Sequence, residues 1–545
     1  MAPHLLQLDS RDNVLIALAD LKAGEEVEFA GQRYTPLRNV PAKHKFAVRD
    51  LAVGDNVIMY GVLVGKAVRP IAAGELLTTS NIQHQSATFH EQAGEFQWTP
   101  PEVSRWKQRT FLGYRRSDGQ VGTRNYWLVV PLVFCENKNI QVLKQAFEEE
   151  LGFAAPQVYR RQVAEMAKAY REGKTADLSA PTESAPVQRR LFENIDGIRF
   201  LLHEGGCGGT HEDSNNLCGL IAGCIHHPNV AGATVLSLGC QHAQIGILRE
   251  EIRKRDPKFD KPLIILEQQR SGSEAAMMSE AIRQTFLGLV EANKAQRAPA
   301  PLSNLCVGLK CGGSDGFSGL SANPAIGHTS DLLAAIGGRT ILSEFPELCG
   351  VEQELINRGK NKAVGDRFIQ LMRDYAARAA AVRSGFDMNP SPGNMRDGLL
   401  TDAMKSAGAA KKGGTSPVSA VLDYPEYSTE PGLNLQCTPG NDVECVTAQV
   451  GAGASVVLFT TGLGTPTGNP ITPVVKLSTN SALAERMHDI IDIDTGAVIA
   501  GEKTIEQMGE TILDFVVQVA SGEVRTKAEV KSQEDFIPWK RGVSL

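Results

Sequence analysis

The sequence has no excess of positive charge and no long apolar run. Its formal net charge is -6 at pH 7, which disfavours nucleic acid or an anionic membrane surface as a partner. No apolar stretch reaches the roughly 18 residues that a membrane-spanning helix needs. The opening residues, MAPHLLQLDSRDN, lack the basic segment followed by an apolar one that marks a signal peptide. We therefore expect no nucleic-acid partner, no membrane partner and a cytoplasmic location.

Two motifs are also missing. The 10 cysteines include no CxxC pair, so the pattern favours reduced thiols that are buried or bind metal over a disulfide framework. No GxGxxG follows a first strand with an acidic residue about 20 positions later, which argues against a nicotinamide enzyme.

The length predicts several domains, because 545 residues exceed what one hydrophobic core usually holds. Turn-forming glycines between short apolar runs predict a small β unit at residues 1–90. A polar linker follows at 91–108, and strand and helix patterns alternate through an α/β middle domain at 109–295. An Ala/Pro-rich linker, 291–301, leads to a C-terminal α/β domain at 302–545. The polar segment 174–188 is predicted to be a surface loop. The fold class is therefore α/β and multidomain.

Polar loops follow two predicted strands of the C-terminal domain. The strand at 305–309 runs into Cys311-Gly312-Gly313-Ser314-Asp315-Gly316, and the strand at 340–342 runs into Glu344 and Glu347. In open α/β sheets, ligands lie at the ends of neighbouring parallel strands. We interpret the two loops as half of an active site that holds a metal.

Three thiols follow three predicted strands. Cys207 comes after the strand at 198–202, Cys240 after the strand at 233–238, and Cys311 after the strand at 305–309. They could converge on iron, with His203 or a carboxylate completing the site. The alternative is that each is a small buried hydrophobic residue. A single iron and an iron–sulfur cluster both remain open, because cysteine ligands allow both.

Other polar residues have two interpretations each. Glu344 and Glu347 could ligate metal or act as the base, or could cap the next helix. Asp315 could bind metal or substrate hydroxyls, or form an Asx turn. Arg124 could clamp a substrate carboxylate, or brace a turn through a salt bridge. Lys476, after a strand, is a further base candidate.

Several motifs, in order along residues 11–500, resemble those of the altronate/galactarate dehydratase family. The motifs are HKFAV, GYRRSDGQVGTRNYW, HEGGCG, SLGCQ, KCGGSDGFSGLSANP, SEFPE, PSPGN and FTTGLG. The resemblance implies a sugar-acid lyase that uses Fe²⁺, another divalent cation being possible. Its substrate would be an aldonate or aldarate such as altronate or galactarate, converted to a 2-keto-3-deoxy acid. It also implies a SAF or β-clip domain, a middle domain that forms a homodimer, and a Rossmann-like C-terminal variant with a mostly parallel sheet.

On the matching motifs we assign site residues. The metal ligands are Cys207, Cys240, Cys311 and Asp315. The remaining assignments are catalytic roles for His203, Glu344, Glu347 and Lys476, and substrate binding for Arg124, His44, Ser314, Asp315, Asn323 and Asn394.

The chain departs from the family pattern at a few positions, which leaves a different substrate open. Thr78-Thr79-Ser80-Asn81 lacks two family histidines, and Gln241, Met395 and Met59 replace Glu, Lys and Lys. Two alternatives follow: another lyase of the superfamily, such as one that expels sulfite, and a sugar-acid-binding protein without catalysis.

Overall fold

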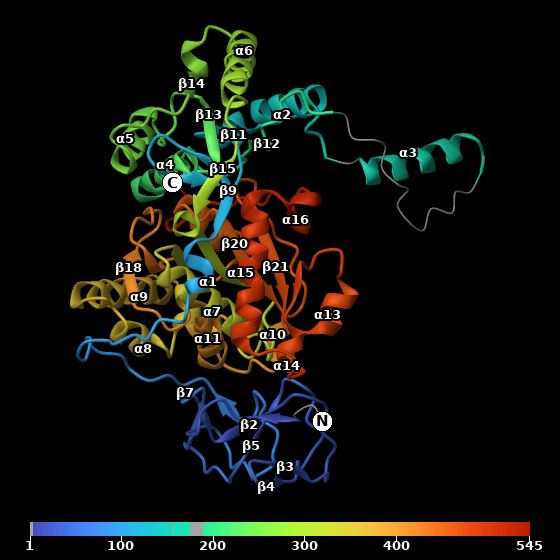
Figure 1. The fold of residues 1–545 in the computed structure, drawn as a ribbon, viewed down its shortest axis with the longest axis vertical. Coiled ribbons are helices and arrows are strands. Elements are labelled where there is room, and N and C mark those ends of the chain that lie inside the picture. Colours follow the sequence, from blue (N-terminus) through green and yellow to red (C-terminus); the bar gives the residue numbers. More distant parts are fainter. Residues whose placement is uncertain (1–3, 156, 175–188, 545) are drawn as a thin grey trace.

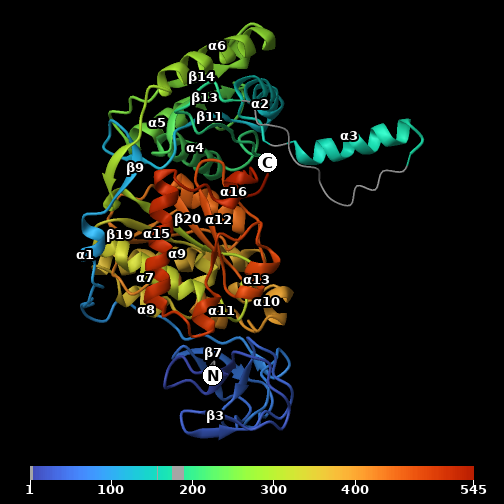
Figure 2. The same cartoon turned by 45° about the vertical axis from the view of Figure 1, so that its right-hand side comes forward.

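A computed structural model describes residues 4–155, 157–174 and 189–544. The chain forms three parts stacked along one axis (Figures 1 and 2): a small N-terminal β unit at one end, the C-terminal α/β unit in the centre, and the middle α/β unit at the other end. The predicted α/β class and N-terminal sheet unit are confirmed. No described helix combines the length and apolarity needed to span a membrane.

The N-terminal unit packs its apolar core directly against the C-terminal unit. Val57 and Val64 from this unit share one buried cluster with Phe317, Leu320 and Met404. Residues at its rim can therefore reach the large sheet. Its three small sheets contain β1 Leu5–Leu6, β2 Val14–Ala17 and β5 Lys45–Ala47; β3 Val27–Phe29 and β4 Gln32–Tyr34; and β6 Asn56–Met59, β7 Val62–Ala67 and β8 Ile82–Gln83.

The middle unit contains a four-stranded parallel sheet in the order β12-β11-β13-β14. Its central strand, Tyr-Trp-Leu-Val-Val-Pro, is buried at every position, as a strand covered on both faces should be. The strands are β11 Tyr126–Pro131, β12 Gly197–Phe200, β13 Val230–Ser237 and β14 Leu263–Glu267, and the helices are α2 Asn137–Leu151, α3 Val158–Arg171, α4 His211–His226, α5 Ile245–Arg255 and α6 Glu274–Ala292.

Helix α3 extends away from the body of the protein in both views. None of its residues is buried, in contrast to α2, which buries Ile140, Leu143 and Phe147. The predicted loop 174–188 lies outside the described residues except for Lys174.

The Ala/Pro-rich segment before the C-terminal unit is partly a strand, where we had predicted only a linker. Strand β15, Ala298–Pro301, pairs antiparallel with β9, Thr110–Arg115, which also pairs with β10, Val121–Gly122. Prolines suit this position because β15 is an edge strand, where missing N–H donors cost no ladder bond. In the other linker, 91–108, the short helix α1, Ser104–Lys107, buries Trp106.

The C-terminal unit is built on seven parallel strands in the order β18-β19-β17-β16-β20-β21-β22. From β16 the chain adds strands on one side and then returns to add β20 on the other. The point where the winding reverses lies between β16 and β20, and such points hold ligands beyond the carboxyl ends of the strands. The strands are β16 Cys306–Cys311, β17 Arg339–Leu342, β18 Val418–Leu422, β19 Gly432–Gln436, β20 Val456–Thr461, β21 Val474–Ser478 and β22 Ile493–Asp494.

Helices cover both faces of this sheet, and α15 runs along its length in Figure 1. Their apolar sides join Leu309, Leu342 and Leu458 in one buried cluster. The helices are α7 Ala322–Ala335, α8 Glu352–Asn357, α9 Lys362–Ala381, α10 Pro392–Arg396, α11 Asp402–Ala410, α12 Asp442–Gly451, α13 Ser481–Arg486, α14 Gly496–Ile499, α15 Ile505–Ser521 and α16 Lys527–Val530.

Gly206, in the loop after β12, is expected to tolerate no side chain. Its φ is +96°, and a Cβ atom there would lie 2.0 Å from the carbonyl oxygen of Leu132. Gly206→Ala should lower the free energy of unfolding by about 1–3 kcal/mol, from left-handed backbone strain and the displaced neighbour. Gly246→Ala is the control, because that glycine lies in α5 with open space around it and should gain up to about 1 kcal/mol. Urea unfolding monitored by circular dichroism measures both, and equal midpoints would contradict the close approach.

Candidate active site

A cluster of buried charged side chains lies at the carboxyl ends of β16 and β17. Cys311 ends β16, and Glu344 and Glu347 follow β17, with Glu347 in the 3-10 turn η4, Phe345–Leu348. Lys405 comes from α11, and Lys412 comes from the turn η6, Lys411–Gly413, that follows it. The structure thus brings together the thiol and the two carboxylates that the strand-end pattern predicted.

The cluster is held by short polar contacts. Lys412 Nζ lies 2.7 Å from Cys311 Sγ and 2.9 Å from Glu344 Oε2. Cys311 Sγ lies 3.4 Å from Glu347 Oε2. Lys405 Nζ donates to Glu347 Oε1 at 2.7 Å.

Lys310 extends the cluster on its other side. Its ammonium donates to Glu344 and lies 3.1 Å from Asp442 Oδ1. Three ammonium groups therefore face three carboxylates. The side chains of Asp442 and Lys405 are 28% and 9% exposed, and the others at most 3%, so solvent reaches the cluster at Asp442 and Lys405.

The charges in the cluster shift one another's pKa values. Burial opposes the charged form of Lys310, but Glu344 and Asp442 outweigh it and raise its pKa well above the ordinary value. Burial also opposes ionisation of Glu347, but Lys405 and Lys310 outweigh it and lower its pKa. Burial, reinforced by Glu344, raises the pKa of Cys311 to about 12. Near neutral pH the cluster therefore holds ammonium groups, carboxylates and a protonated thiol.

Glu344 adopts a left-handed backbone conformation, with φ of +68°. This is uncommon for a residue with a side chain, and it persists only where surrounding contacts enforce it. Here the Glu344 N–H donates to Thr438 Oγ1, and its carboxylate accepts from Lys310 and Lys412. The conformation turns the carboxylate into the cluster and does not serve helix capping.

Lys476 and Lys310 lie in the same row of paired residues across neighbouring strands of the sheet. Lys310 pairs in register with Phe459, and Phe459 with Lys476. The Lys476 ammonium is buried and lies 3.5 Å from the centre of the Phe459 ring, and it has no hydrogen-bond partner among the residues that the structure describes. Burial lowers its pKa to about 7. It is therefore the buried amine beside the cluster that can lose its proton near neutral pH.

The N-terminal unit contributes lysines on either side of His44, which we predicted to bind substrate. The His44 ring lies 3.2 Å from its own loop, at Ala42 O. Lys43 instead forms an ion pair with Asp315 at 2.9 Å, and Lys45 donates to Gly398 O at 2.7 Å. Burial lowers the pKa of Lys45 to about 7.

The predicted substrate residues of the Cys311 loop mostly hold the loop in place. Asn323 donates to Gly408 O and accepts from Thr460 Oγ1, and Asn394 donates to Ser314 O. Asp315, fully buried, accepts from Thr479 Oγ1 at 3.1 Å as well as from Lys43. The buried hydroxyl of Ser314 has no hydrogen-bond partner in the described part of the chain.

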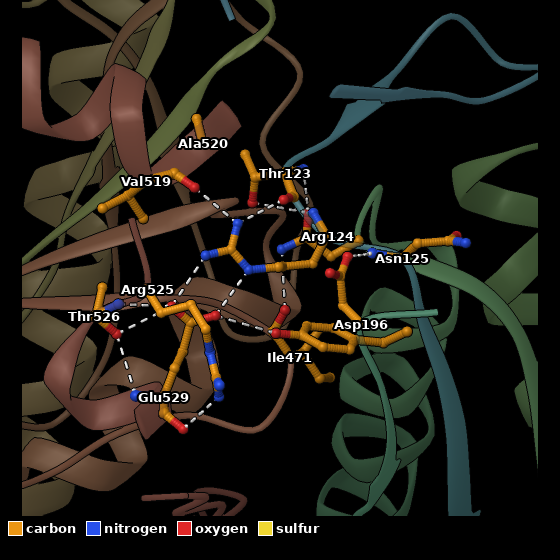
Figure 3. Close-up of polar contacts among 12 residues, drawn as sticks. Thr123, Arg124, Asn125, Asp196, Ile471, Val519, Ala520, Arg525, Thr526 and Glu529 are labelled. Atoms are coloured by element: carbon orange, nitrogen blue, oxygen red, sulfur yellow. Dashed lines mark hydrogen bonds and ion pairs between the residues drawn. The ribbon is translucent and has the colours of Figure 1, made fainter. Parts of the chain in front are cut away.

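Arg124 forms a bidentate pair with Glu529, as Figure 3 shows. Its Nε and Nη2 atoms lie 2.8 and 3.0 Å from the two Glu529 oxygens, and its Nη1 donates to Thr123 O and Val519 O. The side chain is 3% exposed. This geometry is that of the bracing alternative, and it joins the middle unit to α15 and α16.

His203 and two predicted metal ligands lie elsewhere, at the end of the middle sheet. Among the described residues, Cys207 and Cys240 do not join Cys311 in any group of ligand atoms within 4.8 Å, so the predicted thiol trio does not form. The physical reason is that Cys207 and Cys240 follow β12 and β13, whereas Cys311 follows β16 of the other sheet. His203 lies 2.7 Å from Pro131 O and accepts from Gly205 N, and burial lowers its pKa to about 4. It is a neutral brace for its loop.

The donor atoms of the Cys311 cluster are of a type that binds metal, but lysine ammonium groups already contact them. One thiol and two carboxylates, from Cys311, Glu344 and Glu347, lie within 4.8 Å of one another. Lys412 and Lys405 already bind these atoms, and the three lysines balance the three carboxylates. A divalent cation would meet uncompensated repulsion, so these residues do not fit Fe²⁺.

Sequence reasoning missed the lysines of α11 and η6 as site residues. Lys405 and Lys412 are seven positions apart, two helical turns, in a segment otherwise rich in Ala, Gly and Ser. Two lysines on one face of such a buried helix were the available signal. Lys43 and Lys45 carried no such signal, because their role depends on how two units pack.

Comparison with known proteins supports a single family along the whole chain. Residues 3–85 match the altronate/galactarate dehydratase SAF domain, 113–293 the second domain of D-galactarate dehydratase/altronate hydrolase, and 302–544 the C-terminal domain of D-galactarate/altronate dehydratase. Altronate dehydratase of Escherichia coli is 34% identical over 99% of both chains. Galactarate dehydratase (L-threo-forming) of Escherichia coli is 30% identical over 96% of this chain and 93% of its own. The (2R)-sulfolactate sulfo-lyase subunit beta of Chromohalobacter salexigens is 29% identical over 79% of this chain and 97% of its own.

Proposed function

Because the chain belongs to the altronate/galactarate dehydratase family and is a sugar-acid dehydratase, we propose that it removes water from an aldonate or aldarate at the Cys311 cluster. Altronate and galactarate are the substrates that the names of its relatives suggest. The observation that carries the location is the concentration of buried ammonium groups at the carboxyl ends of β16 and β17, beside the reversal point between β16 and β20. Their N–H groups can donate charge-assisted hydrogen bonds to the carboxylate of a sugar acid.

The reaction needs a base for the weakly acidic proton beside the carboxylate. Lys476 suits this role because its buried amine has no partner and a pKa near 7. Its Nζ takes the proton from C2, and the electron pair left behind spreads onto the substrate carboxylate. The ammonium groups of Lys310 and Lys412 stabilise that developing charge.

Departure of the C3 hydroxyl completes the reaction. Lys405 is the most exposed ammonium of the cluster and donates a proton to the leaving oxygen, so that water departs. Glu347, ionised and bound to Lys405, holds that donor in place. The product enol then ketonises to a 2-keto-3-deoxy acid. No step requires a metal at the cluster, consistent with its poor fit to Fe²⁺.

Expulsion of sulfite is the second candidate, because a sulfo-lyase subunit is nearly as similar as the dehydratases. The same base and cations would serve that elimination. Incubation of the purified full chain, under anaerobic and reducing conditions, with a panel of aldonates, aldarates and sulfolactate tests both candidates. We expect a 2-keto-3-deoxy acid from at least one sugar acid; sulfite release from sulfolactate alone would replace the dehydratase assignment.

Proton removal by Lys476 predicts a specific pH profile. Since the protonated amine cannot act as a base, kcat/KM should fall tenfold per pH unit below about 7 and level off above it. Lys476→Met should lower kcat/KM by about 100-fold or more and abolish its decline below pH 7.

In the same variant, activity should fall but the free energy of unfolding at low pH should rise. The buried ammonium destabilises the fold fully below pH 7, and this penalty declines as the pH rises from about 7 toward the ordinary value of 10.5. Lys476→Met should therefore be more stable than the parent at pH 6. Lys503→Met, at an exposed position, is the control and should keep the profile. If kcat/KM of Lys476→Met still declined below pH 7 as in the parent, Lys476 would not be the base.

We further propose that the three matched segments act as a β-clip domain, a dimer-forming middle domain and a Rossmann-like catalytic domain in a cytoplasmic homodimer. The contacts of Lys43 and Lys45 with the C-terminal unit support a shared role of the first and third segments at the substrate site. The 10 unpaired cysteines are compatible with a reducing compartment.

A further inference from the structure

Three cysteines gather at the carboxyl edge of the middle sheet. Cys135 follows β11, Cys207 follows β12 and Cys240 follows β13, and β11 lies between the other two strands. This is the point where the winding of the sheet reverses, the place where open α/β sheets bind ligands. These three are exposed, whereas six of the other cysteines are buried and Cys349 is half-buried.

Backbone hydrogen bonds tie the three loops together. Phe134, next to Cys135, donates its N–H to Gly205 O at 3.1 Å. His242, two residues after Cys240, donates to Cys207 O at 3.3 Å, and Ala243 donates to Gly206 O at 3.1 Å. Each cysteine is therefore within two residues of a bond to a neighbouring loop.

The loops are braced from behind. Gly206 approaches Leu132 too closely for a side chain, and Gln241 bonds both Gly239 N and Ser237 Oγ, each at 2.6 Å. His203 is fixed between Pro131 and Gly205. Buried polar side chains thus fix the backbone on both sides of the exposed thiols, as a binding site requires.

The three thiols lie in loops that backbone hydrogen bonds join to one another. Among the described residues, however, the three sulfurs do not lie within 4.8 Å of one another. A single ion, with sulfur ligands at about 2.3 Å, draws its thiolates closer than this. An iron–sulfur cluster spans a wider gap because each thiolate binds a different iron.

We propose that Cys135, Cys207 and Cys240 hold an iron–sulfur cluster in which one iron has no cysteine ligand. The ligands are soft thiolates, the class that selects such clusters. Within the described part of the chain, no hydrogen bond from a lysine to these thiols is found, whereas Lys412 Nζ lies 2.7 Å from the thiol of Cys311.

Anaerobic reconstitution of the full chain with Fe³⁺, sulfide and dithiothreitol as the reductant tests the proposal. We expect about four iron and four acid-labile sulfide per chain, a broad visible absorption band and an electron paramagnetic resonance signal after reduction. Cys135→Ser, Cys207→Ser and Cys240→Ser should each lose most of the bound sulfide and the visible band. Cys349→Ser and Cys311→Ser are controls that should retain both.

The readouts are independent of turnover, so failure of the proposed reaction and failure of the cluster are distinguishable. Circular dichroism melting of each variant checks that loss of the band is not loss of the fold. Iron bound by the three cysteines without sulfide would overturn the cluster in favour of a single ion. Equal iron and sulfide in the triple serine variant and the parent would overturn the site altogether.

Discussion

Lys412→Met should lower kcat/KM for the sugar acid by about 100- to 1000-fold, the usual effect of removing one charged group that stabilises a developing anion. Lys412 is the ammonium that contacts both Cys311 Sγ and Glu344 Oε2, and its side chain is 1% exposed. Methionine has a similar length and leaves the cluster with two ammonium groups facing three carboxylates. Attraction for the anionic substrate should weaken together with stabilisation of the enolate, so both KM and kcat should worsen.

Stability should fall in the same variant by about 3 kcal/mol, because Glu344 stays buried with one cation fewer. Lys411→Met is the matched control, since the neighbouring lysine is only half-buried and makes no contact with Cys311 or Glu344. Steady-state kinetics and thermal melting of the three proteins separate the two effects. A Lys412→Met protein with parental kcat/KM would contradict the placement of the reaction at this cluster.

The strand-end rule predicted part of the site correctly because it depends on local sequence. Cys311, Glu344 and Glu347 each follow an apolar run directly, and adjacent parallel strands bring such positions together. The prediction that Cys207 and Cys240 join Cys311 was wrong, because the rule brings strand ends together only within one sheet, and these two cysteines follow strands of the middle sheet. Cys135 belongs to the same pattern, following the strand of residues 126–131.

Residues whose role depends on packing between units were beyond sequence reasoning. Lys43 reaches Asp315, 272 positions later in the chain, because the N-terminal unit packs its core onto Phe317 and Leu320. The charge state of Lys476 was equally hidden, since it follows from complete burial without a partner. Sheet order and burial decide these properties, and both are set by the whole fold.

Arg124→Met should lower the free energy of unfolding by about 3–5 kcal/mol while leaving KM for the sugar acid near its parental value. The Glu529 side chain is only 9% exposed, and the substitution removes the bidentate partner of its carboxylate. It also removes one hydrogen bond each from the carbonyls of Thr123 and Val519, which keep Arg297 Nη2 and Gly522 N as donors. Thermal melting and steady-state kinetics of the same preparation give both quantities. A large rise in KM with an unchanged melting temperature would contradict the bracing role and support the alternative in which Arg124 binds the substrate carboxylate.

Removing the partner charge as well should recover much of the lost stability. In Arg124→Met/Glu529→Gln no uncompensated charge remains buried, so the double variant should melt well above Arg124→Met, with a coupling energy of about 1–3 kcal/mol. The pH dependence supplies a second check. Burial raises the pKa of Glu529, but Arg124 outweighs it and holds the pKa below the ordinary value of 4.5. The pair therefore stabilises the parent above pH 4.5, and that advantage over Arg124→Met disappears as the pH falls through the lowered pKa. An advantage that persists in acid would mean that Arg124 stabilises the junction between the two sheets through its carbonyl contacts rather than through Glu529.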